Sequence, residues 1–210
     1  MKRYLHRHSG VTRFNHWIMV ILFGLAGFSG LALFHPNLFP LTGIFGGPQW
    51  TRIVHPYFGI GVFIAFLFML ARYWRDNLPT KDDAEWIKHS GDMLKGNQTA
   101  MPPVGKYNAG QKGVFWGVCI CLIVLLVIGV LFWQAWFANS VPIPLQRLAV
   151  VLHALAAFII SLLVVIHIYA ALWVKGTVRA MTQGTVSAGW AKQHHYLWYK
   201  KVTGGSTDRT

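Results

Sequence analysis

Four long apolar stretches constrain this chain more than any other feature. They cover about residues 17–34, 54–73, 113–133 and 149–174. Each is close to the ~20 apolar residues that an α-helix needs to cross a hydrocarbon layer. A mean hydropathy of +0.43 with only 12% charged residues excludes an ordinary soluble domain. We therefore predict an all-α fold, an integral membrane four-helix bundle forming one domain over residues 1–210.

The basic residues are distributed unevenly around these stretches. In a four-helix arrangement, 17 of the 19 lysines and arginines fall on one side. They lie in the N-terminal arm, in the middle loop 76–112 with its flanks, and in the tail 175–210, whereas Arg52 and Arg147 fall on the other side. The positive-inside rule then predicts that both termini and the middle loop are cytoplasmic in a bacterial inner membrane.

The formal net charge of +13 follows mainly from this topology and from contact with anionic membrane lipid. No groove-reading motif accompanies the basic residues, so we predict no nucleic-acid partner.

Two histidines in the fourth stretch, His153 and His167, lie 14 positions apart. That spacing is close to four helical turns, so both side chains face nearly the same side, roughly 21 Å apart along the axis. Ionisable groups at such depth are costly and usually functional. The topology places His55 at the depth of His153, and His16 at the depth of His167.

An axial imidazole from each of two helices can hold a haem iron between them. We therefore predict two b-type haems stacked across the bilayer, with His55 and His153 holding the outer haem iron, and His16 and His167 the inner one.

Small residues flank these histidines, and two explanations for them stay open. They could let a flat haem lie against the helices, or they could reflect ordinary membrane helix packing, which favours glycine and alanine. The residues are Gly27, Gly30, Gly59, Gly61, Ala154, Ala156 and Ala157. Six further histidines are expected to be solvated or to face headgroups: His6, His8, His35, His89, His194 and His195.

The cysteines restrict the redox chemistry. Cys119 and Cys121 are two positions apart on one helix, so they point to different sides and cannot bridge each other. The absence of a Cys-x-x-Cys-His motif excludes covalent haem attachment, and two cysteines cannot hold an iron–sulfur cluster. The loops on the outer side are too short for a folded domain, so any outer redox donor has to come from another subunit.

Two cytoplasmic segments have recognisable patterns. In the middle loop, Thr80 and Asp83 are spaced as a capping box, and the polar segment 105–112 offers many hydrogen-bond donors on the side of His16 and His167. In the tail, four aromatic residues stand beside lysines, which is typical of an interfacial membrane anchor. They are Trp190, Tyr196, Trp198 and Tyr199.

Short motifs along the chain resemble those of one protein family. They are Arg13-Phe14-Asn15-His16-Trp17, Arg52-Ile53-Val54-His55-Pro56, Tyr107-Asn108-Ala109-Gly110-Gln111-Lys112, His167-Ile168-Tyr169, Trp173-Val174-Lys175-Gly176 and Trp190-Ala191-Lys192-Gln193-His194-His195. Together they resemble the gamma (cytochrome b) subunits of membrane-bound respiratory formate dehydrogenases over nearly the whole chain. The resemblance implies the same two histidine pairs as haem ligands. It also implies a quinone site, for menaquinone or ubiquinone, at Asn108, Gly110 and Gln111 beside the inner haem, with His167 nearby.

The resemblance further implies the partners and the reaction. A molybdenum- or tungsten-containing catalytic alpha subunit would oxidise formate, and a periplasmic iron–sulfur beta subunit would pass electrons to this chain. The chain would then serve as the electron-transfer and quinone-reducing subunit of a formate:quinone oxidoreductase, with no formate-oxidising site of its own. A trimer of heterotrimers is the implied assembly.

Two alternatives remain. A cytochrome b subunit of a membrane-bound hydrogenase or related oxidoreductase would share the haem chemistry and differ in its outer partner. A non-redox transporter or membrane anchor would use the histidines as proton relays and would be expected to carry acidic residues inside the membrane. All six acidic residues lie in loops or in the tail, which disfavours a transporter.

Overall fold

The computed structural model describes residues 3–94 and 101–204. Lys2, Lys95 and Arg209, which belong to the predicted cytoplasmic charges, lie outside this part. The chain divides into two compact units, which are described separately. Unit 1 combines Met1–Arg13, Arg72–Trp116 and Ile166–Thr210, and unit 2 combines Phe14–Ala71 and Gly117–Val165.

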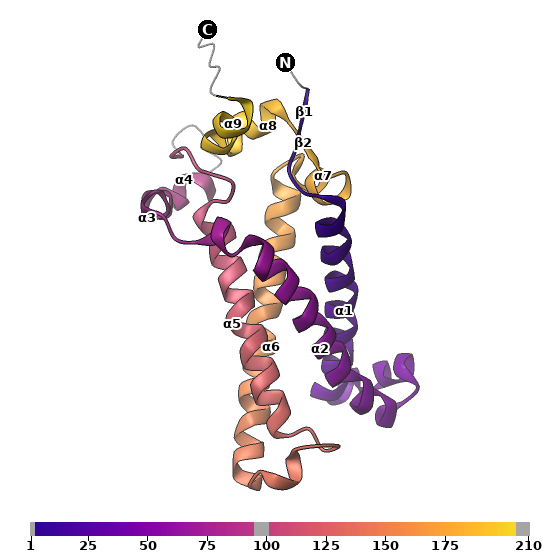
Figure 1. The fold of residues 1–210 in the computed structure, drawn as a ribbon. Coiled ribbons are helices and arrows are strands. Elements are labelled where there is room, and N and C mark those ends of the chain that lie inside the picture. Colours follow the sequence, from indigo (N-terminus) through magenta and orange to yellow (C-terminus); the bar gives the residue numbers. More distant parts are fainter. Residues whose placement is uncertain (1–2, 95–100, 205–210) are drawn as a thin grey trace. The chain divides into compact units, whose positions relative to one another are not determined.

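Four long helices carry the apolar stretches, and they are drawn in Figure 1. They are α1 (Gly10–Phe34), α2 (Pro48–Tyr73), α5 (Ala109–Leu131) and α6 (Ile143–Trp173). All four are long and apolar enough to cross a membrane, which confirms the four predicted helices. Each begins before its apolar stretch, because polar residues such as Arg13, Lys112 and Gln146 occupy the first turns. Backbone hydrogen bonds define a helix, so a polar first turn lowers the hydropathy without ending the helix.

The sequence explains where two of these helices begin. The Ser9 hydroxyl accepts a hydrogen bond from the backbone N–H of Thr12 at 3.3 Å, as expected of a helix N-cap. Pro48 opens α2, where its missing N–H costs nothing. Gly46 and Gly47 precede it with φ of 85° and 102°, a backbone conformation that glycine adopts without steric cost. They follow a 3₁₀ helix, η1 (Pro36–Phe45), and a second one, η4 (Ala138–Ser140), lies between α5 and α6.

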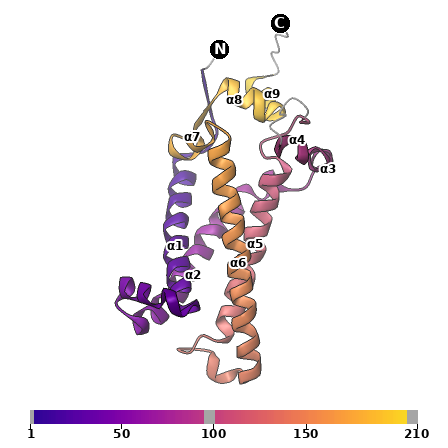
Figure 2. The same cartoon turned by 180° about the vertical axis from the view of Figure 1, so that it is seen from behind.

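Small residues bring the helices of unit 2 close together. A Cβ atom on Gly61 of α2 would lie 3.1 Å from Leu22 Cδ1 of α1. A Cβ atom on Gly117 of α5 would lie 2.8 Å from Leu163 Cδ1 of α6, and these two helices run side by side in Figure 1 and in Figure 2. Helix packing therefore accounts for Gly61, one of the small residues for which two explanations were open.

Unit 1 contains short helices and a small sheet. The helices are η2 (Arg75–Asn77), α3 (Lys81–Lys88), α4 (Ser90–Leu94), α7 (Thr177–Thr182), α8 (Ala188–His194) and α9 (Tyr196–Thr203). The strands β1 (Tyr4–His6) and β2 (Thr185–Ser187) pair antiparallel, with Leu5 opposite Val186. The all-α expectation missed this sheet, because three-residue strands are too short to show an alternating pattern.

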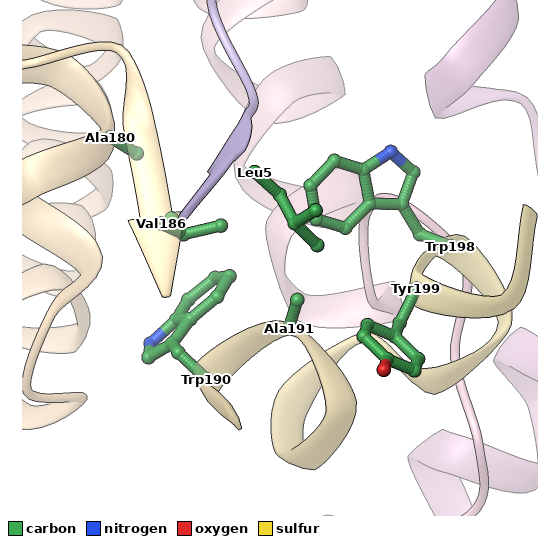
Figure 3. Close-up of a cluster of buried hydrophobic side chains, with 7 residues drawn as sticks. All are labelled: Leu5, Ala180, Val186, Trp190, Ala191, Trp198 and Tyr199. Atoms are coloured by element: carbon green, nitrogen blue, oxygen red, sulfur yellow. The ribbon is translucent and has the colours of Figure 1, made fainter. Parts of the chain in front are cut away.

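A hydrophobic core joins the strands to the tail helices. It consists of Leu5, Ala180, Val186, Trp190, Ala191, Trp198 and Tyr199, whose side chains converge in Figure 3. The prediction of an interfacial anchor was therefore wrong for Trp190, Trp198 and Tyr199, which are buried in this core. Aromatic residues beside lysines are typical both of a membrane-interface belt and of a small amphipathic core, and the sequence pattern does not separate the two.

Candidate functional site

The structure brings the predicted outer pair of histidines together in unit 2. His55 comes from α2 and His153 from α6, and their ring centroids lie 6.3 Å apart with an angle of 70° between the ring planes. Two imidazoles on opposite sides of one metal ion need about 6 Å between ring centres. That span is two metal–nitrogen bonds of about 2 Å each plus roughly 1 Å from each nitrogen to its ring centre. The observed separation fits that arrangement.

Ser29 of α1 fixes the orientation of the His55 ring. Its Oγ lies 2.9 Å from His55 Nδ1 and 2.7 Å from the carbonyl oxygen of Leu25. A hydroxyl has one proton, and Ser29 donates it to the backbone carbonyl. Its oxygen therefore accepts a hydrogen bond from Nδ1–H of His55. This tautomer leaves the lone pair of His55 Nε2 available to a metal, as metal-binding histidines require.

Glycines stand against both rings. A Cβ atom on Gly30 of α1 would lie 3.1 Å from His55 Cε1, and one on Gly129 of α5 would lie 3.2 Å from His153 Cε1. The Phe132 ring also meets His153 edge-on, at 5.3 Å between centroids. The residues present therefore fit a bis-histidine haem, because each ring is held from the side and the tautomer of His55 leaves its Nε2 lone pair available.

Sequence reasoning found Gly30 and missed Ser29 and Gly129. A hydroxyl residue next to a glycine inside an apolar helix was the signal that could have identified Ser29. Across residues 3–94 and 101–204, no three His, Cys, Asp or Glu side chains gather as metal ligands. Two axial imidazoles are what a haem needs, since the porphyrin supplies the other four nitrogens.

The predicted inner pair falls in two units. His16 lies in the part of α1 that belongs to unit 2, where its ring meets Trp17 edge-on at 5.5 Å between centroids. His167 lies in the part of α6 that belongs to unit 1. Both histidines are within helices rather than at their ends. The pairing of His16 with His167 stays a prediction.

Asn108 and Gln111 form a capping box at the start of α5. The Asn108 side-chain oxygen accepts from the backbone N–H of Gln111 at 2.9 Å. The Gln111 side-chain oxygen accepts from the backbone N–H of Asn108 at 3.1 Å. Because both carbonyl oxygens are engaged, each side chain is left with its NH₂ group, a pure donor.

The surroundings of this box are packed closely. A Cβ atom on Gly110 would lie 3.0 Å from Trp86 Cη2 of α3, so Gly110 allows α3 to approach α5. Lys112 is buried, and its Nζ lies 2.7 Å from Asp83 Oδ2. Asp83 also accepts from the backbone N–H of Thr80 at 2.6 Å, which confirms the predicted capping box. Desolvation is the largest single effect on the pKa of Asp83 and raises it. The hydrogen bonds from Lys112 and Thr80 together outweigh desolvation, so the pKa is lowered.

Two of the six histidines expected in solvent are buried, so that expectation was wrong for them. His8 is 5% and His195 is 2% exposed. His8 Nδ1 lies 2.9 Å from the Tyr73 hydroxyl, and His195 Nδ1 donates to the Gly105 carbonyl at 2.9 Å. Arg7, which the sequence indicated only as a topology charge, is also buried. Desolvation lowers the pKa of Arg7 to about 10 and is only partly offset by Tyr107, Tyr73 and Asp76.

Comparison with known proteins identifies relatives over almost the whole chain. Residues 7–184 match the family described as prokaryotic cytochrome b561. The nitrate-inducible formate dehydrogenase cytochrome b556(Fdn) subunit of Escherichia coli (strain K12) is 44% identical over 192 residues, 91% of this chain and 88% of the relative.

Two further relatives have similar coverage. The formate dehydrogenase cytochrome b556(fdo) subunit of Escherichia coli (strain K12) is 43% identical over 196 residues, 93% of this chain and 92% of the relative. The formate dehydrogenase cytochrome b556 subunit of Haemophilus influenzae is 42% identical over 195 residues, 93% of this chain and 82% of the relative. With its four apolar helices and its paired histidines, the chain belongs to the prokaryotic cytochrome b561 family of membrane cytochromes b.

Proposed function

We propose that this chain is the dihaem cytochrome b subunit of a formate dehydrogenase complex. It would carry electrons from a periplasmic iron–sulfur subunit across the membrane to a quinone reduced near the cytoplasmic side. Formate dehydrogenase subunits 42% to 44% identical to it support this complex over a hydrogenase or a related oxidoreductase. The subunits that copurify with the chain decide between these complexes.

The main support for the proposal is that His55 and His153 lie close together and that Ser29 is hydrogen-bonded to His55. Their ring separation of 6.3 Å and the tautomer imposed by Ser29 support an outer haem. The inner haem at His16 and His167 rests on the matching depths of these residues in the sequence.

The chain's own residues set the environment for electron transfer. When bound, haem b supplies a one-electron carrier. His55 and His153 would supply neutral imidazole nitrogens, and Ser29 holds the His55 ring in one orientation. Phe132 and the glycines surround the rings with apolar atoms, and such a low-dielectric shell tunes a haem potential.

Asn108 and Gln111 would bind the quinone, with Gly110 between them and His167 nearby. Their NH₂ groups can each donate to a quinone carbonyl oxygen, which gains negative charge as electrons arrive and loses it as protons are taken up. Menaquinone and ubiquinone share this carbonyl chemistry.

The remaining parts of the proposal concern orientation and assembly. Both termini, the loop 76–112 and the tail 175–210 would face the cytoplasm. A catalytic subunit with molybdenum or tungsten would oxidise formate outside, in an assembly that could be a trimer of heterotrimers. Protons taken from the cytoplasm for quinone reduction would then contribute to a proton-motive force.

Haem content tests the four-histidine assignment. We expect two b-type haems per purified chain in a reduced-minus-oxidised spectrum with haem quantified. His153→Ala should remove one of the two signals. His35→Ala changes an exposed histidine before η1 and should keep both. A chain made with sufficient haem that binds none would refute the electron-transfer mechanism and favour the transporter or anchor.

A conservative variant tests the quinone site. Asn108→Asp keeps a side-chain oxygen to cap α5 and removes the NH₂ donor. We expect the apparent KM for a soluble naphthoquinone to rise about tenfold, the effect of losing one hydrogen bond, while haem content is unchanged. An unchanged KM would place the quinone elsewhere.

A further inference from the structure

Three consecutive carbonyl groups just before the Asn108–Gln111 capping box are held by distant parts of unit 1. The Val104 carbonyl accepts from the backbone N–H of Leu197 at 3.1 Å. The Gly105 carbonyl accepts from His195 Nδ1 at 2.9 Å, and the Lys106 carbonyl accepts from Arg7 Nη2 at 2.6 Å. The N-terminal arm and the C-terminal tail thus donate hydrogen bonds to the same three residues. We call Arg7, His195 and the Leu197 N–H the carbonyl clamp.

The two side chains of the clamp are buried and are hydrogen-bonded to each other. Arg7 is 7% and His195 is 2% exposed, and Arg7 Nη2 lies 3.4 Å from His195 Nε2. Donation from Nδ1–H to the Gly105 carbonyl leaves Nε2 as an acceptor, so one tautomer of His195 satisfies both contacts. A buried histidine with this single arrangement has little freedom to move.

Aromatic rings hold the Arg7 guanidinium in place. Its Cζ lies 4.8 Å from the Trp198 ring centroid, 5.1 Å from that of Trp190 and 5.6 Å from that of Tyr107. Trp190 and Trp198 belong to the hydrophobic core of the tail, drawn in Figure 3. Cation–π contacts with desolvated rings are stronger than exposed ones. The clamp is therefore anchored in a packed core rather than in a solvated loop.

We propose that the carbonyl clamp is a positioning device for the quinone-binding amides. Only Tyr107 separates the last clamped residue, Lys106, from Asn108. Asn108 and Gln111 point their carbonyl oxygens at the α5 backbone, so the backbone position sets where their NH₂ groups point. A displacement of about 1 Å of a positioned group can already reduce its effect strongly. The clamp would prevent such a displacement of the two amides. This inference rests on the proposed quinone site at Asn108 and Gln111.

Two substitutions of His195 separate positioning from simple packing. The amide nitrogen of asparagine can occupy the place of histidine Nδ1, so His195→Asn keeps the donor to the Gly105 carbonyl. The longer glutamine places its amide near Nε2 and loses that donor. The measurement is the rate at which a soluble naphthoquinone oxidises the reduced haem of the purified chain, as a function of quinone concentration.

The expected result is a split between KM and maximal rate. His195→Gln should raise the apparent KM about tenfold with little change in the maximal rate, whereas His195→Asn should stay near wild type. If both variants shift KM equally, or if neither does, the positioning role is refuted. If His195→Gln fails to assemble with haem, Arg7→Met against Arg7→Lys carries the same test, because lysine retains a charged donor.

Asn108→Asp in the same assay separates the two proposals. A raised KM in Asn108→Asp together with a normal KM in His195→Gln overturns the clamp and leaves the quinone site standing. A normal KM in Asn108→Asp overturns the quinone site, and the clamp's positioning role falls with it.

Discussion

Ser29 shows how one residue can decide the chemistry of a ligand. Its hydroxyl donates backward to its own helix at Leu25 and accepts from His55 Nδ1, which fixes the tautomer and leaves Nε2 for a metal. Partners of metal-binding histidines usually influence affinity and potential in this way.

Ser29→Ala should weaken the outer haem site. It removes the acceptor of the His55 Nδ1–H bond and leaves the ring free to rotate, so haem retention should fall roughly 10- to 100-fold. Haem quantification and a redox titration measure the effect. Ser161→Ala is the matched control, since Ser161 also donates to its own helix, at Ala157, and no hydrogen bond joins it to a histidine in the described residues. Equal haem loss in both variants would contradict the role of Ser29.

At the scale of elements, a partly buried ion pair attaches α3 to α5. Lys112 Nζ contacts both carboxylate oxygens of Asp83, at 2.9 and 2.7 Å, and Asp83 also caps α3 through Thr80. One carboxylate therefore fixes the start of α3 and its position beside α5, close to the proposed quinone amides.

Asp83→Asn should destabilise unit 1 clearly. It leaves Lys112 buried without a counter-charge. Removing one partner of a fully buried pair costs about 3 kcal/mol, and the partial exposure of Asp83 makes that value an upper bound. Thermal unfolding in detergent measures the change. Glu85→Gln breaks the Lys88–Glu85 pair on the same helix, whose side chains are 70% and 51% exposed, and should have almost no effect. A small change for Asp83→Asn would mean that water reaches Lys112.

At the scale of the whole molecule, three segments far apart in sequence build unit 1. The arm supplies Arg7, the middle loop supplies the clamped carbonyls, and the tail supplies His195. Desolvation, with the charge of Arg7 as the second cause, lowers the pKa of His195 to about 3. The folded state thus keeps this histidine neutral.

The stability of the chain should therefore depend on pH through His195. The unfolded state binds a proton near the ordinary pKa of 6.5 and the folded state only near 3. The contribution of neutral His195 to the free energy of unfolding is complete above pH 6.5. It is lost as the pH falls toward 3, because protons then favour the unfolded state. Between pH 7.5 and 5.5 the loss is about 1 kcal/mol. Thermal unfolding at both pH values should show a smaller difference for His195→Asn, which does not titrate. If the wild type and His195→Asn lose the same stability between these two pH values, the assignment of His195 as buried and neutral is refuted.

Local pattern was enough to predict much of this protein. Long apolar runs alone predict the four membrane-length helices, because a single apolar segment in lipid satisfies all its own backbone hydrogen bonds only as a helix. Depth along those helices was enough to match His55 with His153, and the spacing of Thr80 and Asp83 was enough to predict their capping box.

Only the tertiary structure decided the contacts between segments that are distant in sequence. Ser29 contacts His55 because α1 packs against α2. The hydroxyl beside a glycine marks Ser29 in the sequence, but it does not identify His55 as the partner. Arg7 and His195 look like solvated charges until the arm and tail bury them against Val104–Lys106. The physical reason is that burial of a polar side chain depends on its distant hydrogen-bond partners, whereas helix length and polarity are properties of neighbouring residues.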